Sequence, residues 1–301
     1  MVSVVGIFCA LLSALLYSIM LIFVKMIDLH PVQISLSRCA VQFLTILPYA
    51  QYKHNEVDIT GPMGLKLLLC IRGLLGSSGM MFIYLAVDKL PAGNAITISY
   101  LRMVMVPFLA RILLKESLSI YEIIFAFVAL VGVVLIARPT FLFPISYEEE
   151  AASLSGIIFA LLSALCMALS TIAVSKLGRK THPALHIIYY SFWGVIMCLI
   201  ILTAGGDMKY SCMNDLPMLF SFGIIGNLGQ FLITIALQRE RAGLVVVLHS
   251  TQIVFVYIMQ VAFLGDVPSY LSLIGAALIF STSIAIWVRK VINGKRELAN
   301  T

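Results

Sequence analysis

Three arginine residues interrupt long apolar stretches of this sequence, namely Arg38, Arg72 and Arg102. A guanidinium group is always charged and presents its N–H donors in a planar fork, which matches the geometry of a carboxylate or a phosphate. No Asp or Glu lies deep in any of these apolar stretches, so no obvious ligand exists for a proton relay or a sodium ion. The residue types therefore favour binding of an anionic solute.

Arg102 is the sharpest of these candidates, because it lies near the middle of the apolar stretch 91–110. A side chain at that depth cannot easily extend to the membrane surface. Ser99 lies three residues earlier, which places both residues on one face of a helix. His249 and Gln252 repeat this spacing in a later stretch. Ser, His and Gln side chains also form hydrogen bonds between membrane helices, and this structural interpretation stays open.

Arg38 and Arg72 lie closer to the ends of their stretches, where a long side chain can extend to the membrane surface. Structural anchoring and substrate contact are both open for these two arginines. Tyr100, Asn227 and Gln230 are weaker candidates for substrate contact, since each of them could also hold neighbouring helices together.

The composition identifies the elements that must position these residues. The chain has 301 residues, of which 61% are hydrophobic and 11% charged, far from the balance of a soluble domain. A bilayer core about 30 Å thick requires about 20 apolar residues in a helix. We therefore predict an all-α integral membrane protein with ten transmembrane helices, at about 4–24, 33–51, 64–86, 91–110, 119–137, 154–174, 184–203, 217–237, 243–263 and 269–288.

The sequence contains an internal repeat. The segment GIFCALLSAL at 6–15 returns as GIIFALLSAL at 156–165, and Gly76 returns as Gly226 at the same offset of 150 residues. Each copy holds five predicted spans, and an odd number makes the second copy enter the membrane from the opposite side. The pattern predicts two inverted five-helix repeats, which are typical of secondary transporters that work by alternating access.

The repeat also predicts the domain organisation. Residues 1–139 form the first repeat, residues 140–153 form a linker with an acidic run, and residues 154–301 form the second repeat with a short basic tail. Most of the 20 Lys and Arg residues fall on the side shared by both termini, which predicts cytosolic termini. This distribution accounts for the net charge of +6, so that nucleic acid has little support as a partner.

These residues resemble a known family. The stretch RGLLGSSGMMFIYLAVDKLPAGNAITIS at 72–99, followed by Pro107 and by LLKES at 113–117, is similar to the EamA repeat of the drug/metabolite transporter superfamily. Within that superfamily it resembles the solute carrier 35 families, group G in particular. The resemblance implies a ten-helix transporter with a central cavity lined mainly by its third, fourth, eighth and ninth helices. The second copy has Tyr257 where the first has Pro107, which predicts a ninth helix that is less kinked than the fourth.

We therefore expect a multi-pass secondary transporter that moves a small polar organic solute, most simply an organic anion. Exchange of nucleotide sugars or sugar phosphates is an alternative, and so is a membrane regulator or scaffold that transports nothing. The sequence has no P-loop, zinc-ligand or GxSxG motif, so we expect no catalytic residues, no cofactor and no metal. The expected partners are the small-molecule solute and membrane lipid, and a homodimer stays open, as does the choice between plasma membrane and endomembrane.

Overall fold

The computed structural model describes residues 4–26, 29, 31–53, 61–90, 92–115, 119–137, 142, 154–203, 216–264 and 270–299. Within these ranges the chain is helical and contains no strand. The helices are α1 (Val4–Met26), α2 (Pro31–Tyr52), α3 (Lys66–Lys89), α4 (Ala92–Ser99), α5 (Arg102–Leu109), η1 (Ala110–Leu114), α6 (Ile120–Ala137), α7 (Leu154–Leu177), η2 (Gly178–Lys180), α8 (Pro183–Thr203), α9 (Leu216–Arg239), α10 (Ala242–His249), α11 (Thr251–Leu264) and α12 (Tyr270–Ala299).

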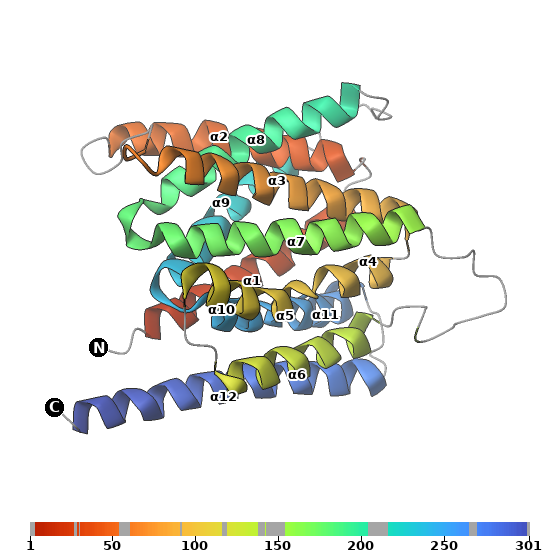
Figure 1. Cartoon of the computed structure of the whole chain (residues 1–301). Helices are drawn as coiled ribbons and strands as arrows, with labels where there is room; N and C mark the ends of the chain where they lie inside the picture. Colours follow the sequence, from red (N-terminus) through yellow and green to blue (C-terminus); the bar gives the residue numbers. More distant parts are fainter. Residues whose placement is uncertain are drawn as a thin grey trace.

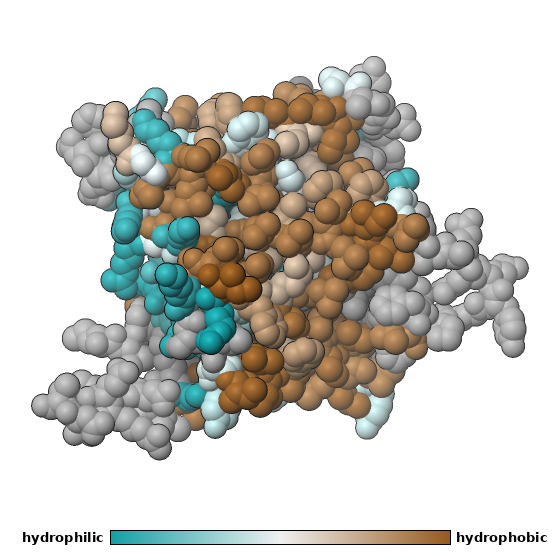
Figure 2. Space-filling view, in the orientation of Figure 1, coloured by the Kyte–Doolittle hydropathy of each residue, from teal (hydrophilic) through white to brown (hydrophobic). Residues whose placement is uncertain are grey.

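The outer surface of the bundle matches a lipid environment. Large apolar side chains such as Phe8, Leu44 and Ile112 face outward, and apolar residues cover most of the face seen in Figure 2. By length and composition, four of the described helical segments can each cross a membrane: Lys66–Ala86, Leu154–Lys180, Pro183–Thr203 and Leu216–Arg239. A helix satisfies its own backbone hydrogen bonds, which lipid cannot do. The prediction of an all-α integral membrane protein is confirmed.

The helices pack in matching pairs. α3 lies along α7 and α1 lies along α9, while α2 packs against α8 and α6 packs against α12 (Figure 1). In Figure 1, α1 and α7 run in opposite directions, and α1 begins at the same side of the bundle at which α12 ends. Each pair therefore joins one helix from the first half of the sequence to one from the second half.

Two of the expected spans are broken in the middle. The first break separates α4 from α5 at Tyr100–Leu101, and the second separates α10 from α11 at Ser250. At both breaks the backbone forms short i to i−3 hydrogen bonds, as from Met103 N to the Tyr100 carbonyl at 2.9 Å and from Ile253 N to the Ser250 carbonyl at 3.0 Å.

The position of the first break differs from the expectation. A kink was expected from Pro107, but Pro107 lies inside α5, between the break and the π-helical turn η1. The second break occurs without a proline, but α11 then continues to Leu264, whereas α5 ends at Leu109 and is followed by the π-helical turn η1. The expectation of a less kinked ninth helix therefore stays a prediction. Hydroxyl groups supply a physical reason for the second break, because Ser250 Oγ donates to the Val247 carbonyl at 2.6 Å and Thr251 Oγ1 donates to the Leu248 carbonyl at 2.8 Å. Such side chains compete with the regular helical bonds.

Candidate functional site

Arg38 lies inside the bundle, on α2, with 7% of its surface exposed. Its guanidinium carbon is 5.4 Å from the centre of the Tyr17 ring and 5.9 Å from the centre of the Tyr190 ring. Its Nη1 donates a weak hydrogen bond to the sulfur of Met80 at 3.7 Å, and its Nε is buried without a hydrogen-bond partner in the structure. The aromatic rings therefore hold the cation while its Nε donor stays without a partner.

Arg72 lies on α3 and is 2% exposed. It contacts the same Tyr190 ring as Arg38. Its guanidinium carbon is 5.3 Å from the Tyr190 ring centre, and its Nη1 donates to the backbone carbonyl of His186 at 2.8 Å. Its Nε is buried and has no partner in the structure. We refer to Tyr17, Arg38, Arg72 and Tyr190 as the arginine–tyrosine cluster.

The electrostatics of the arginine–tyrosine cluster are unusual, because two positive charges are buried close together. Over the part of the chain that the structure describes, no acidic side chain lies within ion-pair distance of Arg38 or Arg72. The ion pair seen there, between Arg241 and Glu122 at 2.9 Å, involves a half-exposed arginine elsewhere in the bundle. A buried charge is costly unless it is paired, and cation–π contacts offset only about 2 kcal/mol. The cluster is therefore suited to accept an anion.

The cluster extends to helices of the second half through Tyr17. The Tyr17 hydroxyl donates to Oε1 of Gln230 on α9 at 2.7 Å, and the Tyr17 ring meets His249 of α10 edge-on, with 5.6 Å between ring centres. Nε2 of His249 is buried and has no hydrogen-bond partner in the structure. His249 is the last residue of α10, so the break before α11 positions it beside Tyr17.

A close approach of α9 to α2 shapes one side of the site. A methyl group on Gly226 would lie 3.0 Å from Nε of Arg38 and 2.9 Å from Nε2 of Gln42, so only glycine fits there without displacing them. Asn227 donates to Oγ1 of Thr45 across the same contact, while its Oδ1 and both amide atoms of Gln42 are buried without partners in the structure. These buried polar atoms remain available to a solute.

The remaining candidates from the sequence lie outside the arginine–tyrosine cluster and differ in how deeply they are buried. Arg102 begins α5, is only partly buried, and stacks on the Tyr100 ring at 4.9 Å. Ser99 is buried, and its hydroxyl donates to the Ile96 carbonyl at 2.8 Å, a local bond within α4. Gln252 is partly buried on α11. Arg102, the sharpest candidate from the sequence, is thus less enclosed than the other two arginines.

The burial of Arg38 and Arg72 excludes extension of their side chains to the membrane surface, while the choice between structural anchoring inside the bundle and substrate contact stays open. Their side chains do not extend to the surface of the bundle but turn inward, toward Tyr190 on α8. Sequence reasoning did not select Tyr17, Gln42 or Tyr190. The available signal was a side chain with a polar end group in an otherwise apolar helix. Such a side chain does not reveal which neighbour its polar group contacts.

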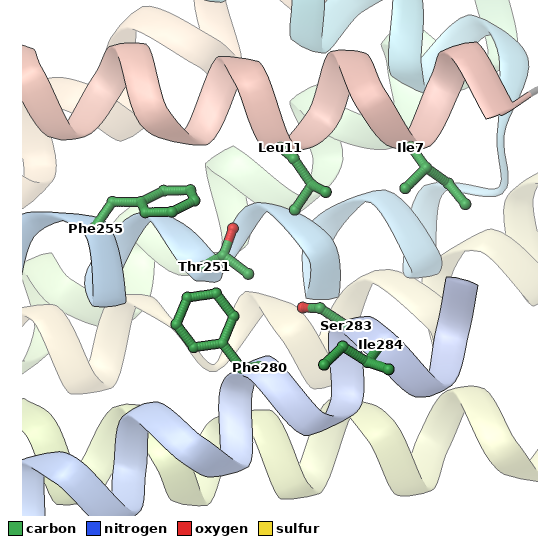
Figure 3. A pocket seen from close by; sticks show the side chains of 7 residues that line it. All are labelled: Ile7, Leu11, Thr251, Phe255, Phe280, Ser283 and Ile284. Atoms are coloured by element: carbon green, nitrogen blue, oxygen red, sulfur yellow. The ribbon is translucent and has the colours of Figure 1, made fainter. Parts of the chain in front are cut away.

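A pocket of about 310 Å³ lies elsewhere in the bundle, between α1, α11 and α12 (Figure 3). Its side chains point into a shared space, and nearly all of them are apolar: Ile7, Leu11, Thr251, Phe255, Phe280, Ser283 and Ile284. The two hydroxyl groups donate to carbonyls of their own helices. This pocket therefore has space but offers no charge or unpaired donor to a polar solute.

Comparison with known proteins identifies the family. The model of the EamA-like transporter family matches residues 4–138 and again residues 154–288. The chain belongs to the EamA-like transporter family. The resemblance noted in the sequence is confirmed, including the likeness to the solute carrier 35 families of group G.

Several relatives of this EamA-like chain carry the names of transporters. It is 35% identical to human solute carrier family 35 member G1 over 95% of this chain and 79% of that protein. It is 24% identical to the pseudopaline exporter CntI of Pseudomonas aeruginosa over 93% of this chain and 95% of that protein. A solved crystal structure shares the fold with a TM-score of 0.77 at 15% identity, over 92% of this chain and 95% of the other. The EamA-like chain is therefore a membrane transporter.

Proposed function

We propose that this EamA-like protein is a secondary transporter that moves a small organic anion across a membrane by alternating access, with the arginine–tyrosine cluster as its substrate site. The observation that carries the proposal is the burial of Arg38 and Arg72 against the same Tyr190 ring, with no carboxylate at ion-pair distance among the described residues. A carboxylate held by two guanidinium forks gains charge-assisted, bidentate hydrogen bonds.

The residues around the cluster supply the neutral contacts that such a solute needs. The donors left without partners include Nε of both arginines and Nε2 of Gln42, and the unpaired acceptors include Oδ1 of Asn227. Gln230 and His249 lie next to Tyr17 and border the same region. Arg102 adds a positive charge on the α5 side and favours anions over cations as they approach.

The proposed architecture is ten spans arranged as two inverted repeats, residues 1–139 and 154–301, joined by a linker at 140–153. The equivalent helix breaks support it, because Tyr100 and Ser250 are separated by the same offset of 150 residues that relates the two copies of the sequence. The opposite directions of α1 and α7 in Figure 1 also support it. Broken helices at the centre of inverted repeats are a common feature of transporter substrate sites.

We place both termini in the cytosol. The hydrophilic residues on the face seen in Figure 2 gather at the side of the bundle where α1 begins. Arg111, Lys115 and Lys176 belong to helix ends on that side, and cytosolic loops carry an excess of such residues. Rocking of the two repeats about the cluster would then expose the arginines alternately to the cytosol and to the opposite compartment.

The test is a two-step experiment on purified protein. Thermal-shift screening against carboxylates, sugar phosphates and nucleotide sugars identifies a stabilising solute, and counterflow in liposomes measures its transport. Arg38→Gln should abolish both stabilisation and counterflow, while Arg111→Gln on the exposed surface is the matched control and should retain both.

The outcomes separate the candidate functions. Stabilisation by phosphate-bearing solutes alone would favour exchange of sugar phosphates or nucleotide sugars at the same arginines. Binding without counterflow would favour a regulator that transports nothing. Full counterflow of an organic anion by a folded Arg38→Gln protein would refute the role of the arginine–tyrosine cluster.

A further inference from the structure

Gln42 is a buried amide at the contact between α2 and α9. Its side chain is 0% exposed, and neither its Oε1 nor its Nε2 has a hydrogen-bond partner among the described residues. Gln42 lies one helical turn after Arg38, so both side chains share one face of α2. A methyl group built on Gly226 of α9 would lie 2.9 Å from Nε2 of Gln42 and 3.0 Å from Nε of Arg38. The amide and the guanidinium are therefore neighbours beside the same glycine.

Asn227 of α9 adds one more acceptor to this contact. Its Nδ2 donates to Oγ1 of Thr45 and, at 3.4 Å, to the backbone carbonyl of Gln42. The Thr45 hydroxyl itself donates to the Val41 carbonyl at 2.6 Å, so its oxygen can only accept from Asn227, which fixes the orientation of that amide. Oδ1 of Asn227 is buried and has no partner in the described chain. We call Gln42 and Asn227 the amide pair.

The unpaired atoms of the amide pair define the group that would satisfy them. They are one donor group, Nε2 of Gln42, and two acceptors, Oε1 of Gln42 and Oδ1 of Asn227. The complement is a group with one acceptor and two donors, which is the composition of a primary carboxamide, with its carbonyl oxygen and two N–H bonds. A carboxylate offers only acceptors and an ammonium group only donors. Each of these would leave buried polar atoms unpaired, which costs free energy.

Arg38 determines what else such a ligand carries. Its Nε is unpaired beside the amide pair, and no carboxylate lies at ion-pair distance from it among the described residues. One helical turn advances about 5.4 Å, a distance that a chain of about two or three carbon atoms spans. The contact joins a helix of the first repeat to one of the second, so the rocking of the repeats proposed above would open it to a ligand.

We propose that the transported solute is a short-chain carboxylate that also carries a primary carboxamide. Arg38 binds its carboxylate, and the amide pair binds its carboxamide. This inference rests on the proposed function of the arginine–tyrosine cluster and adds Gln42 and Asn227 as the residues that determine specificity. A dicarboxylate of the same length binds less well, because its second negative charge would face the two unpaired acceptors.

The experiment compares ligands of equal length on the purified wild-type protein at neutral pH. Succinamate and glutaramate carry the carboxamide, their methyl ketone analogues have a methyl group in place of its amino group, and succinate and glutarate carry a second carboxylate. Isothermal titration measures the affinity of each ligand. We expect at least one carboxamide acid to bind about tenfold more tightly than its ketone and its dicarboxylate, because the comparators leave acceptors of the amide pair unpaired.

Gln42→Leu should weaken binding of the carboxamide acid about tenfold and so abolish its preference over the ketone. Gln51→Leu is the matched control, because it removes the same amide from an exposed position on α2 and should keep the preference. Thermal unfolding without ligand checks that each variant folds, and the wild-type comparison requires no substitution. Equal wild-type affinity for carboxamide acids and ketones would overturn the proposal, as would an unchanged preference in a folded Gln42→Leu protein.

Arg38→Gln separates this inference from the function on which it rests. It should weaken binding of carboxamide acids and ketones alike, since both present a carboxylate. Binding that depends on Arg38 but shows no preference for the carboxamide would refute recognition by the amide pair and leave the anion site intact. Binding of none of these carboxylates by the wild-type protein would refute carboxylate binding at the arginine–tyrosine cluster itself.

Discussion

Two regions of this protein that both include residues of α1 differ in what they offer to a solute. The arginine–tyrosine cluster contains buried charge and polar atoms without partners, but its side chains fill it closely. The pocket between α1, α11 and α12 has about 310 Å³ of space, and its hydroxyl groups are already bonded to backbone carbonyls. Space alone therefore does not identify the site of a polar solute, whereas unpaired donors do.

A substitution of Arg38 is the most direct test of the difference between the two regions. Arg38→Gln should weaken binding of an anionic solute at least about 30-fold, because removing one partner of a buried charge pair costs about 2–5 kcal/mol. Thermal-shift titration of the stabilising solute measures this affinity. Arg72→Gln should weaken binding less, since Arg72 already spends one donor on the His186 carbonyl. Equal affinities for wild type and a folded Arg38→Gln protein would remove the basis of the comparison.

The close approach of α9 provides a second test with its own control. Gly226→Ala should reduce solute affinity about tenfold, because the new methyl group displaces Arg38 and overpacking costs about 1–3 kcal/mol. Gly229→Ala adds the same methyl group to the same helix at 3.4 Å from Tyr17, an ordinary contact distance, and should change little. Similar affinities for the two variants would show that the position of Arg38 is not critical.

Tyr17 connects the cluster to the second half of the chain. Tyr17→Phe keeps the ring against Arg38 but removes the hydrogen bond to Gln230. We expect about a fivefold loss of affinity, the effect of a hydrogen bond worth about 1 kcal/mol. Tyr17→Ala should cost more, because the cation–π contact is then lost too. Isothermal titration of the solute into both variants separates the two contributions. Unchanged affinity of the Tyr17→Phe protein would show that the hydrogen bond to Gln230 does not contribute to solute binding.

Arg102 should have a smaller and more salt-dependent effect. Its side chain is only partly buried, and partly exposed charges contribute about 1 kcal/mol or less. Arg102→Ala should therefore lower the initial rate of uptake about threefold at low ionic strength, and less at high salt. Abolished uptake at every salt concentration would instead place Arg102 in direct contact with the solute.

A substitution in the apolar pocket should have the smallest effect on transport. Ser283→Leu adds an apolar side chain to a space lined by Phe255, Phe280 and other apolar groups, and its lost hydroxyl bonds only to its own helix. We expect unchanged uptake of the anionic solute and equal or higher thermal stability, because filling a cavity restores packing contacts. Loss of uptake in a stable protein would give this pocket a role in transport.

The helix breaks show where prediction from the sequence reaches its limit. Pro107 was visible in the sequence and suggested a stronger kink in the first copy, but both copies also break away from any proline, at Tyr100–Leu101 and at Ser250. The hydroxyl groups of Ser250 and Thr251 bond to carbonyls of the preceding turn at the second break, but Ser191 makes the same kind of bond within the unbroken α8. Tertiary packing therefore decides which of these bonds interrupt a helix.

The sequence by itself determined the membrane environment, the all-helical class and the EamA-like family, because apolar length and repeated motifs are local properties of the chain. It also revealed the arginines, since charge within an apolar stretch is conspicuous in any sequence. Only the tertiary structure decided that Arg38 and Arg72, rather than Arg102, are the most enclosed, and that Tyr17 and Tyr190 surround them. The physical reason is that depth along a helix is set by residue number, whereas the direction of a side chain and its partners depend on how separate helices pack.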